Sequence, residues 1–157
     1  MRAVAVHRAS LLAHLVLLFA VLLTAAIPAQ AASPADVTAT WHGLWTSLTD
    51  RGYLYEANLT LSADAANHVT GTIHWTLRQS PRANEQAKLN LTGVEYVKGT
   101  FFPDAGVVKM NGVSLDDPNH ILGVDQYRLI LSDDGKVLGG ITYDHGPWTG
   151  QIQLGRQ

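Results

Sequence analysis

The sequence predicts an all-β domain, an eight-stranded antiparallel up-and-down β-barrel, and three observations favour that fold. Apolar and polar residues alternate with a period of two along most of residues 41–157, as in strands with one buried face. No window of about a dozen residues in that part keeps helical spacing. Asn-Gly, Asp-Gly and Gly-Pro pairs interrupt the alternation where turns are expected. A β-sandwich of two packed sheets is the alternative.

The first element is a leader. Arg2 and Arg8 precede the apolar run 11–27, which is followed by Pro28 and the small-residue site 29–31. This order is typical of a secretory signal peptide covering residues 1–31. An uncleaved membrane anchor is the alternative, because about seventeen apolar residues approach the lower limit for a span. The proline and the small-residue site favour cleavage, so we expect a secreted or periplasmic protein with no membrane span after cleavage.

Cleavage would leave about 126 residues, the size of one domain. Residues 32–40 are small and without pattern, so we expect a flexible leader before a barrel domain at 41–157. Loss of Arg2 and Arg8 brings the net charge to about −4, which attracts neither nucleic acid nor an anionic membrane. The chain has no cysteine, which excludes a disulfide framework, a thiol nucleophile and a lipid-modified N-terminal cysteine.

Eight strands are expected in the barrel domain, and each shows one apolar phase. They span 41–48, 52–61, 68–78, 88–102, 106–115, 124–131, 136–143 and 148–154. In the third, Val69, Ile73 and Leu77 share one side while threonines occupy the other. Such one-sided strands need a sheet closed on itself or two facing sheets. Glycines within the strands allow the bends of a small barrel, which favours the closed sheet.

The loop lengths distinguish the two ends of the predicted barrel. Successive connections of a meander alternate between its ends. The second, fourth and sixth connections are short, at 63–67, 103–105 and 132–135. The other end receives both long loops, 79–87 and 116–123, together with 144–147. The sequence therefore predicts that a pocket opens at the long-looped end.

A short motif opens the first predicted strand. Gly43, Leu44 and Trp45 fit the G-x-W pattern of lipocalins, Trp41 lies just before it, and Arg156 follows the last strand. With these residues the chain resembles the lipocalin and avidin group of calycin-type ligand-binding barrels. The resemblance implies that Trp45 packs against Arg156 at the closed end, in a structural role. The T-D-Y element and the C-terminal helix of lipocalins are absent, so the likeness is architectural and leaves the ligand open.

Aromatic residues with polar tips gather near the long-looped end. They are Tyr53, Tyr55, Trp75, Tyr127, Tyr143 and Trp148. Such rings offer a large contact area with little loss of rotamer freedom, which suits a pocket for a small apolar or aromatic ligand. The alternative is that the same rings fill the interior, as side chains do in many small barrels.

Two acidic residues, Asp125 and Glu95, fall in the inward phase among apolar neighbours, where an unpaired carboxylate is costly. Either a bulge at Gly93 turns Glu95 outward, or the pair marks a polar interior. An interior carboxylate would anchor a ligand or act as an acid or base with a raised pKa. We expect Asp125 to be the polar anchor of the pocket.

A second polar set lies in two loops of the same end. Its members are Asp116, Asp117, Asn119 and His120 in one loop and Asp144 and His145 in the next. Carboxylates and imidazoles from two loops could hold a divalent cation, calcium or zinc. The spacing matches no defined metal motif, and turn formation by Asp, Asn, Gly and Pro is the alternative.

Three classes of function follow from these observations. The first is an exported module that binds a small apolar or aromatic molecule at the barrel mouth. The second is a protein-interaction, inhibitor or envelope accessory domain that uses loops 79–87 and 116–123 as its contact surface. An enzyme comes third, because no nucleophile elbow, phosphate loop or dinucleotide fingerprint appears and nothing completes a base-and-nucleophile arrangement. No organic cofactor is expected.

Overall fold

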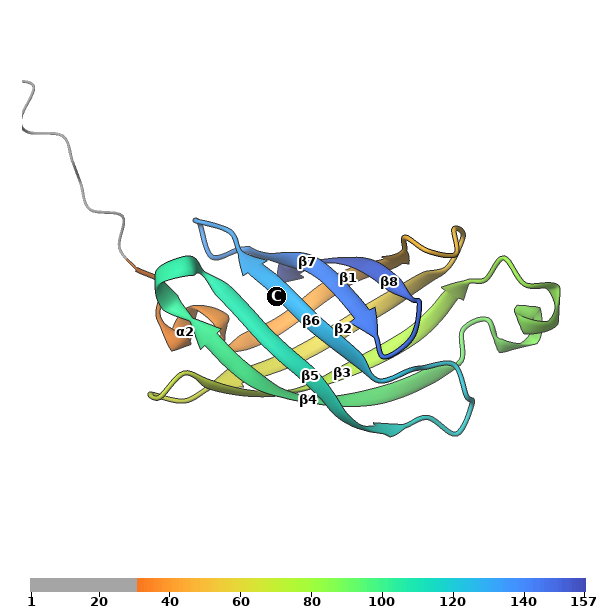
Figure 1. Cartoon of the computed structure of the whole chain (residues 1–157), viewed down its shortest axis with the longest axis horizontal. Coiled ribbons are helices and arrows are strands. Elements are labelled where there is room, and N and C mark those ends of the chain that lie inside the picture. Colours follow the sequence, from red (N-terminus) through yellow and green to blue (C-terminus); the bar gives the residue numbers. More distant parts are fainter. Residues whose placement is uncertain (1–30) are drawn as a thin grey trace, which may run out of the picture. The chain divides into compact units, whose positions relative to one another are not determined.

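Strands with alternating inward and outward side chains pair in chain order, and the last strand returns to the first (Figure 1). The computed structural model describes residues 31–157, so the predicted signal peptide lies outside the described residues except for Ala31. The sheet is a closed antiparallel barrel of eight strands with up-and-down connectivity, which confirms the predicted fold class. Within 31–157, no helix has the length and apolar character needed to cross a membrane.

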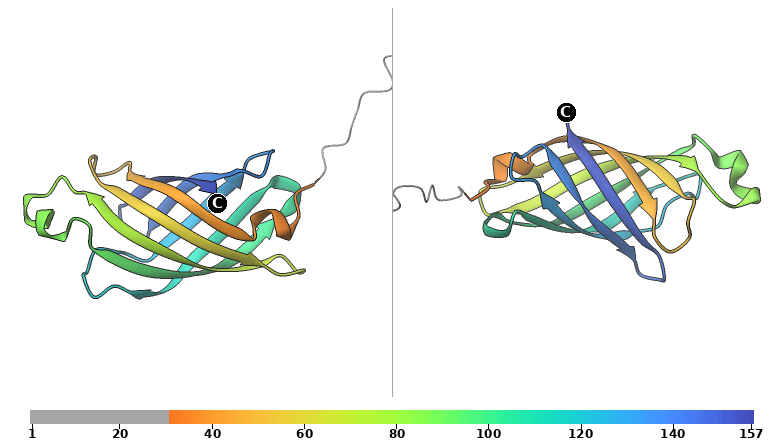
Figure 2. Two further views of the ribbon diagram at one scale, coloured as in Figure 1. Left: turned by 180° about the vertical axis from the view of Figure 1, so that it is seen from behind. Right: turned by 90° about the horizontal axis from the view of Figure 1, so that it is seen from above.

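The strands are β1 (Ala39–Ser47), β2 (Leu54–Ala63), β3 (His68–Gln79), β4 (Thr92–Phe102), β5 (Val107–Asp116), β6 (Asp125–Leu131), β7 (Val137–Asp144) and β8 (Thr149–Arg156). A one-turn helix, α2 (Pro34–Val37), precedes them, and the 3-10 helices η1 (Ala83–Lys88) and η2 (Pro103–Ala105) flank β4. Strand β8 runs beside β1 and closes the sheet (Figure 2).

The core is formed by the inward phase that the alternation predicts. Leu59, Ile73, Leu129 and Leu154 have no exposed surface. Burying each such side chain contributes about 1.5–3 kcal/mol. Because every strand gives one face to this core, the other face remains in water.

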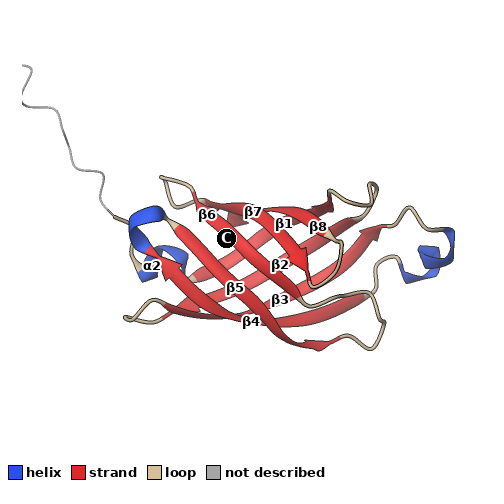
Figure 3. Cartoon of the chain, viewed as in Figure 1, coloured by secondary structure: helices blue, strands red, loops and turns tan. Residues whose placement is uncertain are grey.

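The two ends of the barrel differ as the loop lengths predict. Short turns at 64–67 and 132–136, together with η2, connect strands at one end, where α2 also lies (Figure 3). The other end carries residues 80–91, which contain η1, and residues 117–124. The pairing of Asp125 with Asp144 places the loops before β6 and after β7 side by side, as expected.

The fourth strand is shorter than predicted, because it begins at Thr92 rather than Lys88. Leu89 and Leu91 continue the alternation in sequence but belong to a turn after η1. Asn90 has a φ of 66°, a left-handed conformation that asparagine tolerates and that a strand excludes. The turn is held to β3, since the Asn90 N–H donates to the Leu77 carbonyl at 2.7 Å.

The segment predicted as a leader contains α2 and the first residues of β1. Ser33 and Asp36 form a capping box at the start of α2, with the Ser33 N–H donating to Asp36 Oδ2 at 2.7 Å. Val37 is fully buried, and β1 begins at Ala39. A small-residue segment with a single apolar side chain carries no period, so its docking could not be seen in the sequence.

Trp41, rather than Trp45, occupies the closed end. Its indole N–H donates to the Val37 carbonyl at 3.1 Å, and its ring is fully buried. The Arg156 guanidinium lies 5.6 Å from the centroid of the Trp41 ring and donates to the Asp36 carbonyl at 2.8 Å. The predicted contact between Trp45 and Arg156 is therefore wrong, because strand β1 starts at the closed end and Trp45 lies farther along it.

Candidate functional site

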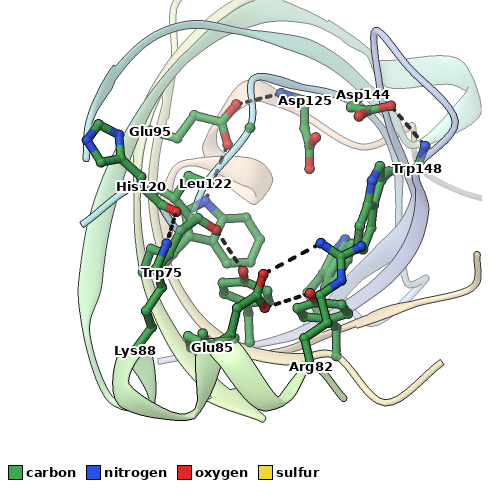
Figure 4. Close-up of a pocket in the computed structure, with 16 residues that line it drawn as sticks. Trp75, Arg82, Glu85, Lys88, Glu95, His120, Leu122, Asp125, Asp144 and Trp148 are labelled. Carbon is green, nitrogen blue, oxygen red and sulfur yellow. Dashed lines mark hydrogen bonds and ion pairs between the residues drawn. The ribbon is translucent and has the colours of Figure 1, made fainter. Parts of the chain in front are cut away.

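A cavity of about 300 Å³ opens at the long-looped end of the barrel (Figure 4). Its walls come from strands β1 to β4, β6 and β7, and its rim from residues 80–91 and 117–124 together with Trp148. The volume is at the lower end of the range for small-molecule pockets. The barrel is therefore packed in its closed half and hollow at its mouth.

Aromatic rings form one wall of this pocket. They are Trp45, Tyr53, Tyr55, Trp75 and Trp148. The rings meet edge to face, with centroids 5.5 Å apart for Trp45 and Tyr55 and 6.1 Å apart for Tyr55 and Trp75. Such contacts fix the rings before any ligand arrives, so the wall is preorganised.

Trp45 can lie in this wall because Gly150 leaves space for its ring and Thr142 binds its indole N–H. Gly150 of β8 faces the indole, and a Cβ there would overlap ring atoms of Trp45. The indole N–H donates to Thr142 Oγ1 of β7 at 2.7 Å. The glycine thus leaves room for the ring and the threonine sets its orientation.

The outer rim is a network of paired charges. Arg82 lies 5.5 Å from the Tyr53 ring centroid and 5.4 Å from that of Trp148, and it pairs with Asp50 at 3.1 Å. Glu85 accepts hydrogen bonds from the Tyr53 hydroxyl and from Ser80, both at 2.6 Å. Burial raises the pKa of Glu85, but these two bonds and Arg82 outweigh burial, so the pKa is lowered.

The two long loops of the mouth are tied to each other and to the wall. Lys88, the last residue of η1, donates from Nζ to the His120 carbonyl at 2.9 Å. The Tyr55 hydroxyl donates to the Ile121 carbonyl at 2.7 Å. Burial raises the pKa of Tyr55, so this hydroxyl remains a donor at neutral pH. The hydrogen bonds of Lys88 and Tyr55 therefore hold both long loops in place around the opening.

Glu95 of β4 lies inside the barrel beneath this opening, with 1% of its surface exposed. Its Oε1 accepts from the Asp125 N–H at 2.9 Å, and its Oε2 accepts from Trp75 Nε1 at 3.3 Å and from the Tyr127 hydroxyl. Burial raises the pKa of Glu95, and the three bonds lower it by less. The inward phase is thus retained, and the register shift in this region lies at Tyr96 and Val97 rather than at Gly93.

Asp125 directs its carboxylate toward the middle of the pocket (Figure 4). Burial, the neighbouring charge of Glu95 and that of Asp144 raise the pKa of Asp125 to about 7. No side-chain hydrogen bond or ion pair joins the Asp125 carboxylate to another described residue. The pocket therefore contains an acidic group that is free to contact a ligand.

Two of the candidate metal ligands, Asp117 and Asp144, accept backbone hydrogen bonds within their own loops. Asp117 Oδ2 accepts from the N–H groups of Ile121 and Leu122 at 2.8 and 2.7 Å. Asp144 Oδ1 accepts from the N–H groups of Gly146 and Trp148 at 2.7 and 3.0 Å. Across residues 31–157, no three His, Asp or Glu side chains are grouped to hold a metal ion. Asp116, His120 and His145 join no such cluster.

The structure places five of the seven predicted ligand-contacting residues in the pocket wall. These are Tyr53, Tyr55, Trp75, Asp125 and Trp148. Tyr127 lies beneath the pocket, 2% exposed, and holds Glu95. Tyr143 lies on the outer face of β7, 38% exposed, because Thr142 takes the inward position.

Sequence reasoning missed Trp45, Arg82, Glu85 and Lys88, which also line the pocket. The direction of the first strand could have predicted the position of Trp45, since β1 ends at the mouth and Trp45 is two residues from that end. The three charged residues lie in a loop and in η1, whose path depends on contacts with the barrel. Comparison with protein families, curated proteins and solved structures found no match to this chain.

Proposed function

We propose that this protein is an exported binding module that takes a small apolar or aromatic molecule into the pocket at the long-looped mouth of the barrel. The observation that carries the proposal is the cavity of about 300 Å³ with its wall of aromatic rings. The cavity is concave and its aromatic wall is preorganised, as in ligand pockets. Export is supported by the signal-peptide pattern of residues 1–31.

Two features of the wall support a ligand over a purely structural interior. Trp148 is only partly buried although it stands at the opening of the core, so an apolar surface remains for a ligand to cover. The Asp125 carboxylate faces the same space and can orient a polar group. Apolar walls with a few placed polar groups are the usual composition of such sites.

The proposal is tested by titrating the purified protein with N-phenyl-1-naphthylamine, a neutral dye that fluoresces in apolar surroundings. We expect saturable binding to one site. Trp148→Ala should weaken that binding at least about fivefold, which is the loss of about 1 kcal/mol of ring contact. Tyr143→Ala is the matched control, because it removes an aromatic ring from the outer face of the neighbouring β7.

Two outcomes would refute small-molecule binding at the mouth. One is the absence of saturable dye binding, and the other is an equal loss in both variants while circular dichroism shows both folded. Either result would favour the alternative function, in which a protein partner contacts residues 79–87 and 116–123.

A further inference from the structure

The inner part of the pocket gathers three carboxyl groups, and burial raises the pKa of two of them, Glu95 and Asp125. Glu95 of β4 accepts from the Asp125 N–H of β6, and Asp144 of β7 pairs in register with Asp125, so the three carboxyl groups line one part of the pocket. Within the described part of the chain, no Lys, Arg or His forms an ion pair with any of these three carboxylates. Buried charges in proteins are normally paired, so this arrangement lacks a counter-charge.

The two cations that line the pocket are occupied at its rim. Arg82 pairs with Asp50 at 3.1 Å and lies 3.6 Å from Glu85. Lys88 donates to the His120 carbonyl at 2.9 Å, and it lies close enough to Glu85 to lower the pKa of that carboxyl. Both rim cations thus have partners at the rim, and neither pairs with the carboxyl groups of the interior.

The position of Glu95 is built into the fold. Gly112 of β5 lies against its carboxylate, and a Cβ at that position would overlap Glu95 Oε1. The Tyr127 hydroxyl, the Trp75 indole and the Asp125 N–H hold the carboxylate in place. A side chain with reserved space and three donors is an organised part of the pocket. Burial outweighs these donors, which favour the ionised form, and keeps the pKa of Glu95 raised, which a bound cation would lower.

The rings beside these carboxylates also favour a cation. Trp75 and Tyr55 stand edge to face at 6.1 Å and line the same cavity as Asp125. The face of an aromatic ring attracts a positive group by its quadrupole, most strongly where water is excluded. Described residues offer no cluster of His, Asp and Glu suited to a metal ion, so the walls fit an organic cation better than a bare one.

We propose that the ligand of this pocket carries a protonated amine, which ion-pairs with Asp125 and Glu95 while its apolar body packs on the aromatic wall. The inference rests on the proposed function and specifies the chemical class of its ligand. The charge of the ligand would supply the counter-charge that the interior lacks. A neutral molecule of the same shape would leave the carboxylates unpaired, and an anion would be repelled by them.

Three probes that share a phenylethyl group distinguish a cationic, a neutral and an anionic ligand: 2-phenylethylamine, 2-phenylethanol and 3-phenylpropionate, with charges of +1, 0 and −1. Each is titrated into the purified protein at pH 8, where Asp125 is ionised, and binding is followed by calorimetry and by NMR. We expect the amine to bind at least about tenfold more tightly than the alcohol, and the carboxylate to bind most weakly.

Asp125→Asn removes one charge without removing a side-chain hydrogen bond. It should weaken amine binding about tenfold and change alcohol binding by less than about twofold. Asp133→Asn is the matched control, because Asp133 is an exposed acidic residue in the turn at the closed end. It should leave the affinities for all three probes unchanged.

The outcomes test the amine proposal separately from the proposal that the pocket binds a small molecule. If the alcohol or the carboxylate binds in the pocket as tightly as the amine, the amine inference fails and the proposed function stands. An amine preference that survives Asp125→Asn unchanged also overturns the inference. If none of the three probes binds and the dye does not bind either, both proposals fail together.

Discussion

The backbone N–H of Asp125 donates to Glu95 Oε1 at 2.9 Å, so one residue orients the first carboxylate of the pocket and supplies the second. Because this bond comes from the backbone, it persists when the Asp125 side chain is replaced. The charge at Asp125 can therefore be removed while Glu95 keeps all three of its donors.

Asp125 should make the free energy of unfolding depend on pH. Its pKa rises from 3.8 to about 7 through burial and the charges of Glu95 and Asp144, so between these values the folded state binds more protons than the unfolded state. The free energy of unfolding then falls as the pH rises through this window, by at most about 4 kcal/mol. Denaturant titrations at a series of pH values measure the fall. The same curve for Asp125→Asn should be flatter, and a curve parallel to the wild type would contradict the prediction.

Amine binding should release a proton below neutral pH. An ammonium group favours the ionised form of Asp125, whose pKa of about 7 leaves it mostly protonated at pH 5.5 in the free protein. Binding of 2-phenylethylamine should therefore release about one proton per site at pH 5.5 and almost none at pH 8.5. Calorimetry in two buffers of different ionisation enthalpy measures this number. Equal proton release at both pH values would count against Asp125 as the partner of the amine.

Gly112→Ala should destabilise the fold. A methyl group at this position overlaps the Glu95 carboxylate and crowds Val124, and such overpacking costs about 1–3 kcal/mol. Gly123→Ala is the control, because no heavy atom lies within 4 Å of a Cβ built there and its φ is not positive. Chemical denaturation of both variants tests the difference. Equal stability of the two would show that Glu95 moves aside freely.

Arg156→Ala should loosen the closed end without unfolding the barrel. The side chain lies over the Trp41 ring and donates to the Asp36 carbonyl, and its exposed position limits the loss of stability to about 1 kcal/mol. We expect faster hydrogen exchange of the Trp41 indole N–H, which donates to Val37 in α2. Arg51→Ala, an exposed residue of the first loop at the mouth, should leave this exchange rate unchanged.

The alternation and the loop lengths predicted most of the fold and the end that carries the pocket. Trp75, Asp125 and Trp148 could be placed because inward phase and chain direction are both local properties of a strand. The G-x-W motif predicts Trp45 at the closed end, whereas the direction of β1 carries it to the mouth. Trp41, four residues earlier and in the same phase, meets Arg156 instead.

Other features depend on contacts that no local pattern records. The inward phase of β7 is weakly marked, since Gly139 and Gly140 have no side chains. The sequence therefore predicts Tyr143 in the pocket, although it points outward. The path of residues 80–91 follows from the bonds of Glu85 with Tyr53 and of Lys88 with His120. Such partners are distant in sequence, and only the folded barrel brings them together.

Within residues 31–157, α2, Trp41 and Arg156 pack together at the closed end, and the pocket opens at the mouth. A ligand must then arrive and depart by the same route, past the loops that Lys88 and His120 join. Its residence time depends on how often those loops separate as well as on its affinity for the walls. Two ligands of equal affinity but different width would therefore exchange at different rates.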